Sequence, residues 1–208
     1  MDHFPLSYLV ESFARSGTAV AGGEATVLFR VLSAGTRLAI WQRHVPSTWP
    51  SRMKPLRSAG PFRAVAEGEP DSAVRRLETA LPVPPPVTMM QDIHLLTGLF
   101  AVVSRQVTVR LRLECVTDDA CTRWHVDAVP LRLLCTYYGP GTEWLAGDDE
   151  ASVPGEVGSP CVALLKGRGF PGEPEGGCLH RSPALSRRPV SQRSRLLLCI
   201  DVPGHFPS

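Results

Sequence analysis

Residues 107–115 read VTVRLRLEC, and their apolar and polar side chains alternate along the whole segment. Because neighbouring side chains of a β-strand point to opposite faces, this period of two predicts a strand with one face in a core. Three later runs, rich in aliphatic residues and bounded by Gly, Pro or Ser, predict further strands at 132–138, 161–166 and 195–202. Several short strands in this part of the chain favour a sandwich or barrel toward the C-terminus.

Two helices are predicted immediately before these strands. Residues 71–81 start with an Asp and a Ser that can cap a helix, and apolar residues follow at helical spacing. Residues 88–106 place apolar side chains every three or four positions, as a core-packed helix does. The proline-rich run 82–86 separates the two because proline lacks an amide donor and fixes φ. Helices followed by strands predict an α+β fold, with the helices packed on the C-terminal strands.

The N-terminal third contains two short apolar runs flanked by glycines, 25–32 and 37–41, which predict two strands or one hairpin. A length of 208 residues suits one compact unit. We therefore expect residues 1–70 to form an extension whose short strands pack on the core. Residues 71–208 are expected to form the helix pair together with the domain built from the later strands.

Composition argues against several classes of protein. The 22 Lys and Arg residues nearly balance 20 Asp and Glu, so the net charge of +2 gives no field for nucleic acid, and a small-molecule partner is expected. The longest apolar stretch, 95–103, is about half of the roughly 20 residues that a membrane helix needs, so it predicts a buried helix and no membrane partner. Asp2 and Glu11 stand where a signal peptide would have basic residues, so we expect a cytoplasmic protein with reduced cysteines. The oligomeric state is left open.

The segment CTRWHVD, residues 121–127, carries the strongest chemical signal. On a strand, His125 and Asp127 point the same way and can face one ion. A second histidine, His180, follows in GCLHRSP, after a stretch long enough for the chain to cross a small barrel and return. One carboxylate and two imidazoles make the facial triad of non-haem Fe(II) sites, which leaves three coordination positions open. We therefore predict His125, Asp127 and His180 as metal ligands.

A 2-oxoacid bound at such a site needs a cation for its far carboxylate, and the planar fork of an arginine suits that role. Arg195, which opens the last predicted strand, is the first candidate, and Lys166, at the end of the run ALLKG, is the second. Tyr137, beside a turn of Gly and Pro residues, is a further candidate because its hydroxyl can donate to a bound carboxylate or sugar-like ligand. Three more arginines lie in 187–193, so which basic residue binds the carboxylate stays open.

Five strings of this sequence resemble a bacterial family called domain of unknown function 1826. They occur in the order RWHVD, LRLLCTYYGPGTEWL, ALLKG, HRSP and RLLLCID. The resemblance covers residues 121–201 closely, and WQR at 41–43 extends it loosely toward the N-terminus. The family name implies no activity, so this resemblance concerns identity alone.

The same residues are similar, more distantly, to the Fe(II)- and 2-oxoglutarate-dependent oxygenases. That superfamily has a double-stranded β-helix, also described as a jelly roll or cupin-like fold. It bears a His-x-Asp, a distal His and then a basic residue on the following strand. The resemblance implies a C-terminal jelly-roll metal-binding domain in which His125, Asp127 and His180 hold Fe(II) and Arg195 anchors 2-oxoglutarate. The implied activity is that of a dioxygenase-like enzyme of unknown substrate.

Two other functions could use the same pocket. Cys121 lies four residues before His125, and Cys178 lies two residues before His180. These four side chains could form a closed Cys₂His₂ zinc site of structural type. The protein would then bind zinc or handle metal without catalysis. A third interpretation is a cupin-like binder of a sugar or small acid that has lost its chemistry.

Overall fold

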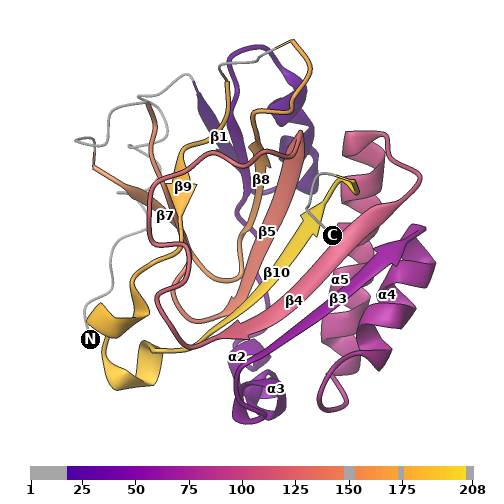
Figure 1. Cartoon of the computed structure of the whole chain (residues 1–208), viewed down its shortest axis with the longest axis vertical. Helices are drawn as coiled ribbons and strands as arrows, with labels where there is room; N and C mark the ends of the chain where they lie inside the picture. The colour runs from indigo at the N-terminus through magenta and orange to yellow at the C-terminus, as the bar shows by residue number, and fades with distance from the viewer. Residues whose placement is uncertain (1–17, 148–152, 173–175, 205–208) are drawn as a thin grey trace.

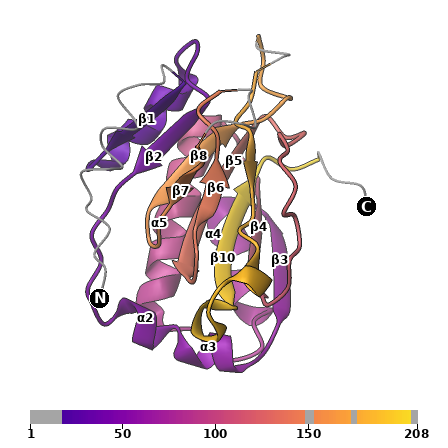
Figure 2. The same ribbon diagram turned by 90° about the vertical axis from the view of Figure 1, so that its left-hand side faces the viewer.

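The structure, a computed structural model, describes residues 18–147, 153–172 and 176–204 (Figure 1). Within these residues the chain is a mixed α+β fold, in which a large sheet carries helices on one face and a small sheet on the other (Figure 1 and Figure 2). The expected α+β class is confirmed. The N-terminal residues on which the expected cytoplasmic location rests lie outside the described part of the chain.

The strands of the described residues form two sheets. The large sheet has seven strands in the order β1-β2-β8-β5-β10-β4-β3, and the small sheet has three in the order β7-β6-β9. Every pair of neighbours is antiparallel except β1 with β2. The bounds of the strands are β1 (Ala19–Gly22), β2 (Leu38–Trp41), β3 (Phe62–Gly68), β4 (Val109–Val116), β5 (Leu131–Tyr138), β6 (Thr142–Trp144), β7 (Gly155–Val157), β8 (Val162–Lys166), β9 (His180–Arg181) and β10 (Arg195–Asp201).

Strand β10 lies inside the large sheet, between β5 and β4. Leu198 stands opposite Leu113 on one side and Cys135 on the other. Every residue of β10 is buried, because the strand has neighbours on both edges and layers on both faces, and its sequence RLLLCID accordingly shows little alternation. All four strands predicted in the C-terminal half are confirmed, as β4, β5, β8 and β10.

Helices cover one face of the large sheet (Figure 2). The helices predicted at 71–81 and 88–106 are confirmed as α4 and α5. By length and apolar composition α5 would also pass as a membrane span, a test that core helices pass as well. Its buried side chains belong to the core against the sheet. The bounds of the helices are η1 (Ala25–Leu32), α2 (Trp49–Arg52), α3 (Lys54–Ser58), α4 (Pro70–Thr79), α5 (Val87–Ser104), η2 (Leu185–Arg187) and η3 (Val190–Gln192).

Residues 25–32 form the 3-10 helix η1, so the strand predicted there is wrong. Leu28 and Val31 are its buried residues, and their spacing of three matches the repeat of a 3-10 helix. The β-branched residues of this run favour a strand. A short helix can bury the same apolar side chains on one of its sides, and the chain forms that helix here. The strand predicted at 37–41 is confirmed as β2, which pairs with β8.

The N-terminal third contributes to both edges of the large sheet. β1 and β2 form one edge, and β3 forms the other. β3 pairs with β4 over the whole register from Phe62 opposite Cys115 to Gly68 opposite Val109. The division of the chain at residue 70 stays a prediction.

The second face of the large sheet packs against the small sheet (Figure 2). Trp144 and Val157 of the small sheet share a core with Leu134, Leu165 and Cys199 of the large one. All six cysteines of the chain lie within the described residues, and each is a free thiol. The candidate site lies at one end of this layer between the sheets.

Candidate metal centre

His125 and His180 meet because their backbones pair. The amide of each donates a hydrogen bond of 3.0 Å to the carbonyl of the other, in an isolated antiparallel bridge. His180 belongs to β9, so the bridge adds the segment around His125 to the edge of the small sheet. The two imidazole rings lie side by side, with centroids 4.5 Å apart. The predicted convergence of these two residues is therefore found.

Asp127 completes the group from two residues further along the chain. Its Oδ2 lies 3.3 Å from Nε2 of His180, and its Oδ1 lies 3.8 Å from Nε2 of His125. The potential ligand atoms of the three residues all lie within 4.8 Å of one another. Among the described residues, this is the group of His, Cys, Asp and Glu side chains arranged so that it could hold a metal ion.

The backbone fixes which nitrogen of each histidine faces the centre. Nδ1 of His125 lies 2.9 Å from the carbonyl of Arg123, and Nδ1 of His180 lies 2.9 Å from the carbonyl of Cys178. A carbonyl only accepts, so Nδ1 carries the proton in both rings. In the neutral form of each ring, which is the form that binds a metal, Nε2 has a free lone pair and points it toward Asp127.

One oxygen of the Asp127 carboxylate accepts a hydrogen bond, and the other has no hydrogen-bond donor. Oδ1 accepts a hydrogen bond from Arg132, whereas Oδ2 is buried without a hydrogen-bond partner. Burial alone would raise the pKa of Asp127, but a hydrogen bond and charge from protonated His180, with the charges of Arg132 and His125, lower it to about 2, so the group is an anion in the metal-free chain. When the histidine rings are neutral, Oδ2 is a buried anionic acceptor without a donor, which is costly. Oδ2 and the two Nε2 atoms form a donor set that fits a divalent cation.

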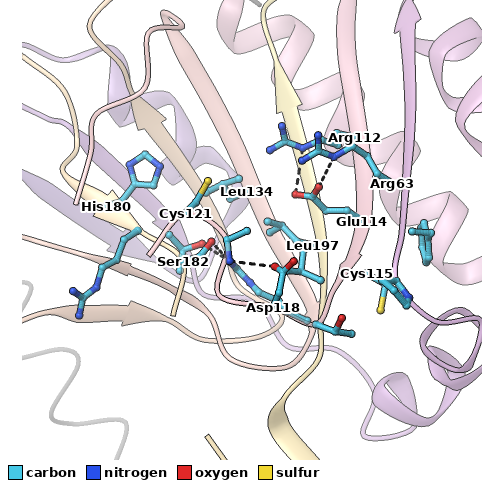
Figure 3. Close-up of a pocket in the computed structure, with 18 of the residues that line it drawn as sticks. Arg63, Arg112, Glu114, Cys115, Asp118, Cys121, Leu134, His180, Ser182 and Leu197 are labelled. Carbon is cyan, nitrogen blue, oxygen red and sulfur yellow. Dashed lines mark hydrogen bonds and ion pairs between the residues drawn. The ribbon is translucent and has the colours of Figure 1, made fainter. Parts of the chain in front are cut away.

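A cavity of about 410 Å³ borders this group and is lined by residues of both sheets. Figure 3 shows His180 and Ser182 on one side of this cavity and Glu114, flanked by Arg63 and Arg112, on the other. His125, Arg132 and Arg195 also line it. The two candidate histidine ligands therefore face a space large enough for a small molecule.

Arg195 is a buried cation in this cavity. Its guanidinium donates to the hydroxyls of Thr136 at 3.1 Å, Ser182 at 3.2 Å and Thr142. No carboxylate of the described residues forms an ion pair with it. Burial lowers the pKa of Arg195 to about 10, against the upward pull of the more distant carboxylates. A guanidinium among hydroxyls, without an anion, is suited to a carboxylate ligand.

The structure does not bring Tyr137 and Lys166 to the cavity, which corrects their assignment as ligand-binding residues. The Tyr137 hydroxyl donates to Asp92 of α5 at 2.7 Å, on the helical side of the sheet. Lys166 donates to the carbonyl of Ser33 at 3.0 Å, and its ammonium lies over the ring of Phe170. Because side chains alternate along a strand, Tyr137 and Lys166 belong to the face opposite the metal centre.

The two candidate cysteines do not join the histidines, so the predicted Cys₂His₂ site is not formed among the described residues. Cys121 is exposed and has a φ of 57°, which breaks the extended backbone before His125 and with it the expected alternation. Cys178 packs in the core between the two sheets, where burial raises the pKa of its thiol. A zinc site would have to use the same three donors as an iron site.

The arginines of 187–193 do not line the cavity at the metal centre. Arg188 makes longer ion pairs with Glu143 and Glu156, and Arg193 donates to the carbonyl of Arg188. Of the four arginines in 187–195, Arg195 is the one that is buried and also lines the cavity. His94 forms a surface pair with Asp71 at 2.8 Å, outside this cavity.

Sequence reasoning missed Arg132 and Asp201. Arg132 contacts Asp127 and also forms an ion pair with Asp201 at 2.6 Å across the β5–β10 pair. The available signal was a charge inside each of two otherwise apolar strands, LRLLC and LLLCID. Charges in strands that are buried on both faces need a partner.

Comparison with solved structures supports the fold. The chain is similar to a dioxygenase for auxin oxidation from rice, with 15% identity, a TM-score of 0.53, and coverage of 88% of this chain and 81% of that one. It is also similar to a prolyl-4-hydroxylase from Pseudomonas putida, with 11% identity, a TM-score of 0.50, and coverage of 85% and 96%. The expected resemblance to the Fe(II)- and 2-oxoglutarate-dependent oxygenases is confirmed at the level of the fold.

Comparison of the sequence gives the identity. A search of curated proteins finds no match. A family defined by sequence matches residues 22–201, a wider span than the strings from 121 to 201 alone indicate, and it includes the WQR segment. The chain belongs to the family described as Protein of unknown function (DUF1826).

Proposed function

We propose that this chain is a non-haem Fe(II)- and 2-oxoglutarate-dependent oxygenase, with His125, Asp127 and His180 as the metal ligands. The observation that carries the proposal is the orphaned, buried Oδ2 of Asp127, which lies 3.3 Å from Nε2 of His180. Two neutral imidazoles and one carboxylate leave coordination positions open, as a catalytic iron site requires. When bound, Fe(II) supplies the redox chemistry with dioxygen that no side chain of this chain provides.

Arg195 is the proposed anchor for the far carboxylate of 2-oxoglutarate. Its buried guanidinium faces the same cavity as the two histidines and donates to three hydroxyls, and no carboxylate of the described residues forms an ion pair with it. A bound carboxylate would satisfy the guanidinium bidentately, and Thr136, Thr142 and Ser182 could turn their hydroxyl protons toward it. These residues orient the co-substrate and hold its other end toward the metal ligands.

The topology is that of a double-stranded β-helix in this proposal. From β4 onward the chain passes between the layers: β4 and β5 belong to the large sheet, with the His125 bridge to the small sheet between them. It continues through β6 and β7 of the small sheet, β8 of the large, β9 of the small and β10 of the large. A chain wound through two facing sheets in this way places His125 and His180 at adjacent positions of one rim.

The substrate is proposed to be a small molecule. The cavity of about 410 Å³ lies in the range of small-ligand pockets. Its lining combines guanidinium, carboxylate and hydroxyl groups, which favours a polar ligand.

The test begins with anaerobic purification, loading with Fe(II) and metal analysis, followed by an assay for succinate formation from 2-oxoglutarate. We expect about one iron per chain and turnover that depends on it. His180→Ala should lose the iron, whereas the control His94→Ala, which removes a surface histidine also paired with an aspartate, should retain it. Stoichiometric zinc without turnover would favour a metal-handling protein, and no metal at all would overturn both.

A further inference from the structure

We propose that Arg132, held by Asp201, is a positioning residue that fixes Asp127 so that Oδ2 alone faces the metal. The inference rests on the proposed function, because it concerns the carboxylate ligand of the same site. It assigns a task to two buried charged residues that lie outside the ligand set. Both belong to the interior of the large sheet, on strands β5 and β10.

The contacts form a fixed relay from β10 to Asp127. Arg132 and Asp201 stand directly opposite each other in the β5–β10 register. Nε of Arg132 donates to Oδ1 of Asp201 at 2.6 Å, and Nη2 donates to Oδ2 at 3.1 Å. Nη1, on the far side of the same planar fork, donates to Oδ1 of Asp127. One guanidinium thus binds one carboxylate with two nitrogens and the metal-facing carboxylate with the third.

Burial makes this arrangement rigid. Asp201 is fully buried, and Arg132 is 9% exposed. Neither group can exchange its partner for water without leaving a buried charge uncompensated, which is strongly unfavourable. The guanidinium is planar, so fixing two of its nitrogens on Asp201 also fixes the direction of the third.

The consequence for the ligand follows from which oxygen is occupied. Arg132 engages Oδ1, which leaves Oδ2 as the oxygen without a donor, and rotation of the carboxylate would break the bond to Arg132. A carboxylate that binds through one oxygen takes one coordination position, whereas a bidentate carboxylate would take two. By holding Asp127 to one oxygen, Arg132 and Asp201 keep one more coordination position of the metal free, as the proposed chemistry needs.

A structural ion pair elsewhere in the chain supplies a matched control. Arg43 and Asp92 also form a two-bond pair between buried side chains, 6% and 11% exposed, with Nη2 to Oδ2 at 2.9 Å. They lie on the helical side of the large sheet, where Tyr137 also contacts Asp92. Breaking this pair should destabilise the fold without changing the metal centre.

The experiment titrates the metal-free chain with Co(II) and follows its visible absorption, with thermal unfolding of each metal-free variant measured in parallel. Asp201→Asn removes the charge that holds Arg132, and Arg132→Lys keeps the charge but cannot reach both carboxylates. We expect each to weaken Co(II) binding about 10- to 100-fold, with altered absorption bands. Asp92→Asn should bind Co(II) as the wild type does, even where its unfolding temperature falls.

Each outcome decides the proposal. Wild-type affinity and spectrum in Asp201→Asn and Arg132→Lys would overturn the positioning role and leave the proposed function standing. Equal weakening in Asp92→Asn would overturn it as well, because the effect would then report general stability. Should Asp201→Asn fail to fold, Arg132→Lys decides alone. Failure of the wild type to bind Co(II) would remove both the positioning role and the proposed metal site.

Discussion

The backbones of His125 and His180 hydrogen-bond to each other in both directions at 3.0 Å, so two residues far apart in the sequence become neighbours on one sheet edge. Because His180 belongs to β9, this backbone pairing at the edge of the small sheet sets the distance between the two imidazoles. Asp127 then needs only to follow two residues later for its carboxylate to reach both rings. The metal centre is therefore built by strand pairing, and its predicted behaviour can be tested residue by residue.

Metal binding should stabilise the fold. At a Co(II) concentration 100 times Kd, binding raises the free energy of unfolding by about 2.7 kcal/mol. For a chain of this size that corresponds to a rise in Tm of roughly 5–10 °C. Removing one ligand in His125→Ala should abolish most of this rise, as differential scanning calorimetry with and without the metal would measure. An unchanged Co(II)-induced shift in His125→Ala would exclude this imidazole as a ligand.

Arg195 should control 2-oxoglutarate affinity. Its replacement in Arg195→Met removes the buried cation, while the surrounding hydroxyls can still bond to one another. Loss of a charge-assisted hydrogen-bonded contact of about 1.5–3 kcal/mol predicts binding that is weaker by roughly 10- to 150-fold. The affinity is measured by calorimetric titration of 2-oxoglutarate into the Mn(II)-loaded wild type and Arg195→Met under anaerobic conditions. The control Arg187→Met removes an exposed arginine and should bind normally; equal affinities in the two variants would count against the assignment.

Most of the regular structure could be predicted from local patterns. The alternation at 107–115 and the helical spacing at 88–106 predicted β4 and α5 because each is a direct consequence of one-sided burial. The prediction for residues 25–32 was wrong because a short run of β-branched residues can bury its apolar side chains either in a strand or in a 3-10 helix such as η1. Strand pairing, such as β2 with β8, depends on residues distant in sequence and leaves no local pattern.

The sequence predicted the three candidate metal ligands correctly as neighbours, but it did not predict all the residues around them. His125, Asp127 and His180 converge as predicted, since the alternation rule links the first two directly. Tyr137 and Lys166 were named as ligand-binding candidates from residue type alone, and residue type does not say which face of a strand a side chain lies on. The pair Arg132–Asp201 could not be predicted, because only the register of β5 with β10 sets the two residues opposite each other.

Cys121 should be dispensable for metal binding. It is exposed and does not join the cluster of candidate ligands. Cys121→Ser should therefore retain the wild-type metal content, as elemental analysis after anaerobic loading would show. In the unmodified chain, maleimide at pH 8 should label Cys121 readily, whereas the buried Cys135, whose pKa is raised to about 12, should react slowly. Loss of metal in Cys121→Ser would instead support a zinc site that includes this cysteine.

The metal-free chain should lose stability in acid partly through Asp127. Its pKa of about 2 in the folded state lies below the ordinary value of 3.8, so the ionised form stabilises the fold. This contribution, about 2 kcal/mol, is fully present above about pH 4 and is lost as the pH falls toward 2. Denaturant unfolding between pH 5 and pH 2 should show a shallower decline in Asp127→Asn than in the wild type. Identical slopes would mean that the carboxylate gains nothing from His180 and Arg132.

Two glycines should respond in opposite directions to the same substitution. At Gly141, just before β6, an added Cβ would lie 1.8 Å from the carbonyl oxygen of Val157, so Gly141→Ala forces β6 and β7 apart. At Gly98, within α5, a Cβ would meet nothing within 4 Å, and alanine is the better helix former by about 1 kcal/mol. Urea unfolding should therefore show lower stability in Gly141→Ala and higher stability in Gly98→Ala. Because β6 also pairs with β9, which carries His180, Gly141→Ala should weaken Co(II) binding too, while Gly98→Ala leaves it unchanged. Normal stability and metal affinity in Gly141→Ala would contradict the close approach of these two strands.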